Sequence, residues 1–225
     1  MEYSLRNPVP GIVKDGRTTF GGSQKLLKNK TLQHCGCGVV AALDLVRYLH
    51  LYRAGFDTDF FAGVEDNQYL PMAVYDLCAH RMQSYIPAIY PIGTDGFSLT
   101  LGLNRYFQRY GLPMQARWGV RQKQLWDEIE VMLAEDLPVI LSIGNRFPQI
   151  WKKEGLTLYR RQRDGTFRKA TQAKGHYVLV VGIDDNCLRI SSWGTEYYLK
   201  RDEFLRYCTD DSIPLLCSIV RLSPR

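Results

Sequence analysis

The spacing of apolar residues predicts that helices dominate the first half of the chain. Behind Gly38, apolar side chains recur every three or four positions and indicate a buried amphipathic helix over about 38–53, with Asp44 and Arg47 off its apolar stripe. Two more helices are predicted, over 67–82 with Pro71 in the first turn, and over 98–111. The segment 55–97 is rich in Gly, Pro, Asp and Tyr, and we expect its loops to roof a cleft.

The second half of the chain has the pattern of a β-sheet. A helical stripe within 124–137 stops at Pro138, and the buried strand Val139–Ile143 follows. A hairpin about Asp164–Gly165 comes next, and then the predicted strands 176–183, 187–194, 197–199 and 217–222. Continuously apolar strands indicate a sheet that is covered on both faces. The sequence therefore predicts the α+β class, with helices first and a mostly antiparallel sheet after them.

Composition and charge narrow the choice of function. The chain has 225 residues, of which 45% are hydrophobic and 23% charged, as in an ordinary globular protein. The net charge of +6 favours anions mildly, but the one basic cluster, 159–169, reads as a solvated hairpin without a nucleic-acid motif, so we expect no nucleic-acid partner. The N-terminal stretch lacks a signal-like apolar segment, which predicts a cytoplasmic protein with no membrane contact. Six sparse cysteines predict free thiols.

Cys35 and Cys37 lie next to a predicted helix start and allow three interpretations. With His34 they could supply two or three metal ligands, but no second Cys or His pair lies at partner spacing. Both could be small buried side chains. Alternatively, one is a nucleophile, because the N–H groups and dipole of a helix N-terminus lower a thiol pKa and can stabilise an oxyanion. We choose Cys37, which is nearer the helix start and flanked by glycines that leave room for a substrate.

A catalytic thiol needs a base. Among the four histidines, His176 begins the most apolar strand and follows Gly175, which leaves room beside it. Taken alone, a histidine at a strand start is more often structural. Paired with a helix-start cysteine from the other half of the chain, His176 becomes the favoured base.

The same segments resemble papain-like cysteine peptidases, and the bacteriocin-processing type in particular. GCGVVAALDLVRYL resembles the Cys-Gly helix of that family, GHYVLVVGIDDN its His strand, and RISSWGTEYYLKRDEF the strand after it. DEIEVMLAEDLPVILSIG resembles the preceding helix and strand, so the likeness covers about a third of the chain in the right order. The resemblance implies one papain-like domain over 1–225, with a helical half (1–120) and a β-rich half (121–225). It also implies a peptide or protein substrate cleaved through a thioester, without metal or cofactor.

The third catalytic position departs from the family pattern. In the family an Asn or Asp orients the histidine, whereas this chain has Ser191-Ser192-Trp193-Gly194. Alignment favours Ser191 as the orienting residue, and simple hairpin register favours Ser192. In the resembling fold, Trp193 shields the histidine pair from water. We expect Gly175 and Trp193 to border the bound substrate.

In the resembling family a Gln about six residues before the cysteine donates a hydrogen bond to the oxyanion. In this chain Thr31 occupies that position relative to Cys37. We favour Gln24, since the Gly-Gly-Ser-Gln turn could project its amide into a cleft, over Gln33. The sequence thus favours a cysteine hydrolase. The alternatives are a catalytically silent papain-like domain that binds a peptide or protein, and a metal-binding protein that uses His34, Cys35 and Cys37.

Overall fold

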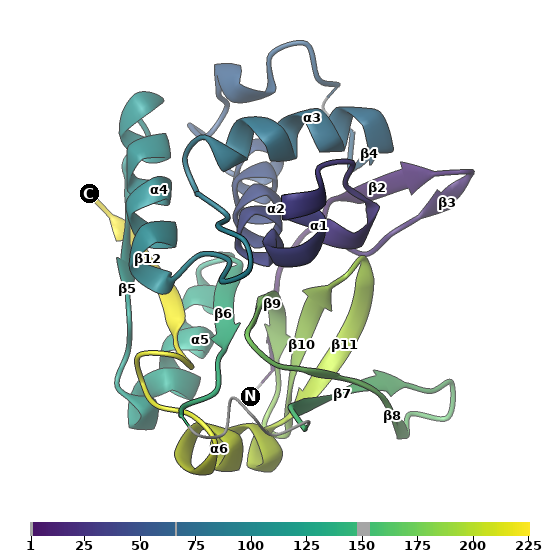
Figure 1. Cartoon of the computed structure of the whole chain (residues 1–225), viewed down its shortest axis with the longest axis vertical. Helices are drawn as coiled ribbons and strands as arrows, with labels where there is room; N and C mark the ends of the chain where they lie inside the picture. Colours follow the sequence, from purple (N-terminus) through teal and green to yellow (C-terminus); the bar gives the residue numbers. More distant parts are fainter. Residues whose placement is uncertain (1, 66, 148–153) are drawn as a thin grey trace.

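A long antiparallel sheet with helices packed against it forms the body of the protein (Figure 1). The computed structural model describes residues 2–65, 67–147 and 154–225. The helices are α1 (Lys30–Cys35), α2 (Cys37–Tyr52), α3 (Met72–Gln83), α4 (Gly96–Arg109), α5 (Leu125–Ala134) and α6 (Arg201–Asp210), with short 3-10 turns η1 (Gln24–Leu26), η2 (Asp59–Phe61) and η3 (Gln122–Gln124). The strands are β1 (Tyr3–Ser4), β2 (Gly11–Lys14), β3 (Arg17–Thr18), β4 (Tyr69–Pro71), β5 (Met114–Trp118), β6 (Val139–Ile143), β7 (Leu156–Arg161), β8 (Phe167–Ala173), β9 (His176–Ile183), β10 (Cys187–Ser192), β11 (Thr195–Lys200) and β12 (Ile219–Pro224).

The main sheet has the strand order β5-β12-β6-β9-β10-β11-β7-β8, and β1 pairs with the far end of β9. Every pairing in it is antiparallel. A smaller sheet has the order β3-β2-β4. The α+β class and the antiparallel sheet expected from the sequence are confirmed.

Strand β9 lies at the centre of the fold. All eight of its residues are buried, and α2 and α5 both pack against it. Figure 1 shows α1 to α4 gathered beyond one end of the central strands and α6 beyond the other end. His176, the first residue of β9, and Cys37, the first residue of α2, line the same cleft.

Most predicted elements agree with the structure within a few residues, and β6 and β9 coincide with their predicted bounds. The basic cluster forms the β7–β8 hairpin, with its turn at Asp164 and Gly165. The helix predicted over 67–82 begins only at Met72, because the residues before it form β4 and Pro71 caps the helix. Helices α1 and α6 and the small sheet were not predicted. The described residues among the first 120 form five strands besides their helices.

The face of α2 that carries Asp44 and Arg47 is buried, which corrects the expectation of an exposed polar face. The sequence places both off the apolar stripe, yet only 3% of Asp44 and 2% of Arg47 is exposed. Arg47 donates hydrogen bonds to the carbonyls of Glu65 and Asn67. Helix α2 is therefore enclosed on almost all sides, and its polar residues are bonded inside the protein. None of the described helices is long and apolar enough to cross a membrane.

Candidate active site

Cys37 is the first residue of α2 and lies where two helices meet. Helix α1 ends at Cys35, and Gly36 caps both α1 and α2. A Cβ on Gly36 would lie 2.5 Å from the carbonyl oxygen of Leu32, so only glycine allows this close junction. A Cβ on Gly38 would lie 2.5 Å from the Thr94 methyl group. The two glycines serve close packing, which corrects the expectation that they leave space for a substrate.

His176 is held by two neighbours. Its Nε2 lies 2.8 Å from Oγ of Ser192, and its ring stacks on Trp193 with centroids 4.3 Å apart and planes 19° apart. The Lys25 ammonium lies 4.6 Å from the centre of the Trp193 ring. When Nε2 carries the hydrogen, it donates to Ser192 and leaves Nδ1 free of a proton. The imidazole is fixed in orientation, with one nitrogen available as a base.

The two serines have different hydrogen-bond partners, and Ser192, which the hairpin register favours, is the one that contacts His176. Ser191 Oγ donates to the carbonyl of Phe20 at 2.8 Å, while Ser192 contacts the imidazole. A bulge between Arg189 and Ile190 sets the register in which Ile190 pairs with Val180. This register puts Ser192 on the same face of the sheet as His176, because side chains alternate along a strand.

Both Cys37 and His176 line one cleft of about 880 Å³. Gln24, Gly175 and Trp193 line it too. Five of the six residues proposed from sequence thus line this cleft. The sixth, Ser191, lines a smaller hollow together with Ser192, Cys37 and His176, and of the two serines Ser192 contacts the imidazole. Pro91, Ile92, Gly93 and Thr94, from the loop region expected to roof a cleft, also contribute to its wall.

The electrostatics of the site favour neutral side chains. Burial raises the pKa of the Cys37 thiol above its ordinary value, and the backbone N–H groups of Tyr177 and Gly38 lower it by less. Burial and, to a smaller degree, the positive charge of Lys25 lower the pKa of His176 to about 3. The sequence predicted a thiol with a lowered pKa at the helix N-terminus, and here desolvation is the larger effect. Burial thus favours the neutral thiol and the neutral imidazole in this cleft.

Gln24 lies at the cleft, but its amide is engaged. Nε2 donates to the carbonyls of Gln33 at 3.1 Å and His34 at 3.2 Å. An amide group has two hydrogens, so both donors of Gln24 are used to hold α1. In this conformation Gln24 does not offer the oxyanion donor expected of it, and the N–H groups at the start of α2 are the remaining candidates.

The metal interpretation finds no support in the geometry. His34 Nδ1 donates to the Lys30 carbonyl at 2.7 Å, and Cys35 Sγ donates to the Thr31 carbonyl at 3.1 Å. Within the described ranges, no group of three His, Cys, Asp or Glu side chains is arranged to hold a metal ion. Cys35 is a packed thiol at the end of α1.

Sequence reasoning missed a buried network that links the two halves of the site. Asp44, on α2 two turns after Cys37, accepts hydrogen bonds of 2.7 Å from the Gly22 N–H and from the Tyr75 hydroxyl. The Gly22 carbonyl in turn accepts a 2.8 Å bond from the N–H of Gly194, next to Trp193. Burial raises the pKa of Asp44 to about 7. The network ties the helix that carries Cys37 to the turn that carries Trp193.

Comparison with known proteins finds a likeness among solved structures. No protein-family model matches the chain, and no curated protein matches it. Among solved structures, the chain is similar to one from Bacillus anthracis that is described as a "putative C39-like peptidase". The superposition covers 100% of this chain and 98% of that chain, with 12% sequence identity and a TM-score of 0.48.

Proposed function

We propose that the protein is a cysteine hydrolase with a single papain-like domain over residues 1–225, and that it cleaves a peptide or related amide bond. The observation that carries the proposal is that Cys37, at a helix start, and His176, whose ring is held by Ser192 and Trp193, line one cleft. A nucleophile, a base and a residue that orients the base are the parts that acyl transfer requires.

In the first half of the reaction, Cys37 Sγ attacks the carbonyl carbon while His176 Nδ1 takes the thiol proton. The carbonyl oxygen becomes an oxyanion, which backbone N–H groups at the start of α2 stabilise. The imidazolium then gives its proton to the leaving amine, and a thioester on Cys37 remains. Ser192 holds the ring throughout but brings no charge, so the imidazolium is stabilised less than it would be by a carboxylate.

In the second half, His176 removes a proton from water, and the resulting hydroxide attacks the thioester. The thiolate leaves and recovers the proton from the imidazolium. Trp193 covers one face of the imidazole and keeps bulk water from the bond between Nε2 and Ser192. Burial favours the neutral form of both groups, so in this mechanism proton transfer accompanies the attack and no preformed ion pair is needed.

A catalytically silent peptide-binding domain is the second candidate. Two observations favour it: the Gln24 amide donates to carbonyls of α1, and the residue next to His176 is an uncharged serine. In this case the cleft would bind a peptide without turnover. Loss of the side-chain oxyanion donor is known in general to cost about two to three orders of magnitude in rate.

The test is cleavage of a mixture of peptides, with new termini identified by mass spectrometry. We expect wild type to create new termini, Cys37→Ala to create none, and Cys35→Ala to resemble wild type, because Cys35 faces the Thr31 carbonyl. Equal cleavage by wild type and Cys37→Ala would refute the proposal. Absence of cleavage together with peptide binding would favour the silent domain.

A further inference from the structure

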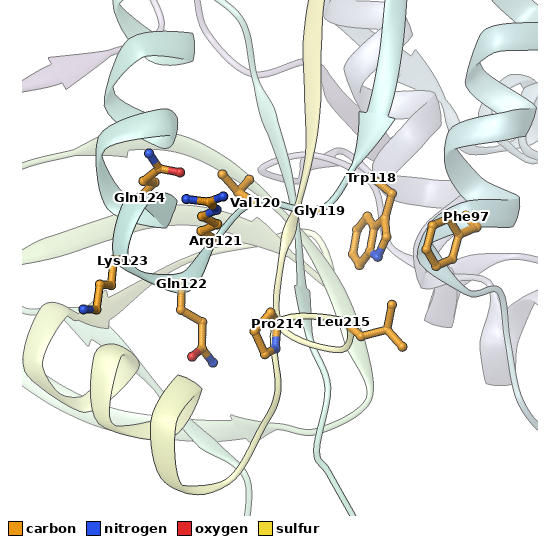
Figure 2. A pocket seen from close by; sticks show the side chains of 10 residues that line it. All are labelled: Phe97, Trp118, Gly119, Val120, Arg121, Gln122, Lys123, Gln124, Pro214 and Leu215. Carbon is orange, nitrogen blue, oxygen red and sulfur yellow. The ribbon is translucent and has the colours of Figure 1, made fainter.

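A second hollow opens beside the catalytic cleft. It has a volume of about 740 Å³ and lies where the end of β5, the turn η3 and the segment 214–215 meet. Figure 2 shows the rings of Phe97 and Trp118 on one side of it and the side chains of Arg121 and Lys123 on the other, with Leu215 near the rings. The hollow thus has an apolar end and a basic end.

The apolar end is continuous with the cleft. Phe97, Trp118 and Leu215 line both spaces. Trp118 also contacts the ring of Tyr177, with centroids 6.4 Å apart, and Tyr177 directly follows His176 in β9. A segment that occupies the catalytic cleft can therefore extend past these three side chains into the second hollow.

The apolar end is formed by well-placed side chains. A Cβ on Gly96 would overlap the indole of Trp118, so the glycine at the start of α4 lets the ring lie directly against the backbone. The chain after Trp118 is anchored, because the Val120 N–H donates to Ser218 Oγ at 2.9 Å. Phe97 is nevertheless 61% exposed and Leu215 52% exposed. Large apolar side chains left open to water at a hollow are typical of a binding site.

The basic end is supplied by Lys123, in η3, and by Arg121, which directly precedes η3. Arg121 and Lys123 both line the hollow, and neither forms an ion pair within the described part of the chain. A negative charge placed there would be attracted by two cations, while a positive one would be repelled. The hollow is therefore complementary to an apolar group that is followed by an acidic group.

We propose that this hollow binds a substrate segment in which a large apolar side chain is followed by a carboxylate, as in a Leu-Glu or Phe-Asp pair. The apolar side chain lies among Phe97, Trp118 and Leu215, and the carboxylate lies near Arg121 and Lys123. The inference rests on the proposed function only in taking the ligand to be a peptide. It names the substrate class that the cleft selects.

The test is an NMR titration of the Cys37→Ala protein, which cannot turn over a substrate. The probes are N-acetyl-Leu-Glu-amide, N-acetyl-Ala-Glu-amide and N-acetyl-Leu-Lys-amide, and the readout is the indole N–H signal of Trp118, assigned with Trp118→Phe. We expect Leu-Glu to bind about tenfold more tightly than Ala-Glu, because the larger side chain buries more apolar area. Leu-Glu should bind about threefold more tightly than Leu-Lys at low salt, with a smaller difference at high salt.

A pair of matched variants tests the residues. Arg121→Glu with Lys123→Glu should reverse the preference between Leu-Glu and Leu-Lys. The control, Lys14→Glu with Arg105→Glu, changes the net charge equally at exposed positions outside the hollow and should leave the preference unchanged. Equal binding of all three probes, or a preference that the control also reverses, would overturn the proposal.

The two proposals can fail separately. If Leu-Glu binds selectively at Trp118 but the wild-type protein cleaves no peptide, the binding site stands and the hydrolase fails. If the wild-type protein cleaves peptides without preference for an apolar residue followed by an acidic one, the hydrolase stands and this inference fails.

Discussion

Two buried titratable groups of the site should change stability in opposite directions as the pH changes. Burial raises the pKa of Asp44 from its ordinary 3.8 to about 7, and burial lowers the pKa of His176 from 6.5 to about 3. Each shift exceeds three units, and one unit corresponds to about 1.4 kcal/mol, so each group is linked to roughly 4–5 kcal/mol of folding free energy. The pH dependence of wild-type stability contains both contributions, so each one is isolated by replacing its residue.

The sign follows from which state binds the proton more tightly. Folded protein holds the Asp44 proton more tightly than unfolded chain does, so this contribution is full below pH 3.8 and is lost as the pH rises to about 7. For His176 the unfolded chain binds the proton more tightly. That contribution is therefore full above pH 6.5 and is lost as the pH falls towards 3.

The perturbation is Asp44→Asn. The new carboxamide oxygen can accept the Gly22 N–H bond, and its NH2 group can donate to the Tyr75 hydroxyl, so the network keeps its contacts without a buried charge. We expect equal stability of variant and wild type near pH 4. At pH 8 the variant should be more stable by about 4 kcal/mol.

The assay is urea unfolding between pH 4 and pH 9, with the difference between variant and wild type plotted against pH. The His176 contribution is the same in both proteins and cancels. His176→Gln serves as the matched comparison, and its difference from wild type should change mainly below pH 6.5. A difference between Asp44→Asn and wild type that does not vary with pH would refute the reasoning.

Three further predictions concern residues of the candidate active site. Ser192→Ala should lower kcat on a cleaved peptide about tenfold or more, because the imidazole loses its hydrogen-bond partner. Ser191→Ala should leave kcat within about threefold. It should lower the free energy of unfolding by about 1 kcal/mol, because its bond to the Phe20 carbonyl is lost. Gln24→Ala should lower the free energy of unfolding, measured with urea, by about 1–2 kcal/mol, because two hydrogen bonds to α1 are lost. Unchanged stability would contradict the role of Gln24 in anchoring α1. The rate of alkylation of Cys37 by iodoacetamide, mapped by mass spectrometry, should rise only above about pH 9, because the pKa of its thiol is raised. A rise in rate near pH 6 would contradict this and would indicate a thiolate–imidazolium pair.

The parts of the site that depend on local pattern could be predicted from the sequence. Apolar periodicity was sufficient to find α2, β6 and β9, and hence to place Cys37 at a helix start and His176 at a strand start. Simple hairpin register predicted that Ser192 shares a face with His176, and Ser192 does contact the imidazole. This register arises only because a bulge between Arg189 and Ile190 shifts the pairing, a feature that the sequence pattern does not predict.

The parts that depend on distant contacts could not be predicted. Asp44 looks like a solvent-facing residue of an amphipathic helix, and only the approach of Gly22 and Tyr75 provides the hydrogen bonds that let it be buried. The engagement of Gln24 depends on α1, a six-residue helix with no periodic signal. A hollow that joins residues from β5, η3 and the segment before β12 has no signature in any one of them.

The central claim is that Cys37 forms a covalent thioester with the acyl part of its substrate. The most direct measurement is to mix wild-type protein with the peptide mixture, stop the reaction in acid, and locate the added mass by peptide mapping. The account predicts an acyl group on Cys37 that hydroxylamine removes, that is absent in Cys37→Ala, and that forms more slowly in His176→Gln. Cleavage of the peptides with no adduct on Cys37, or with the adduct on another cysteine, would contradict it.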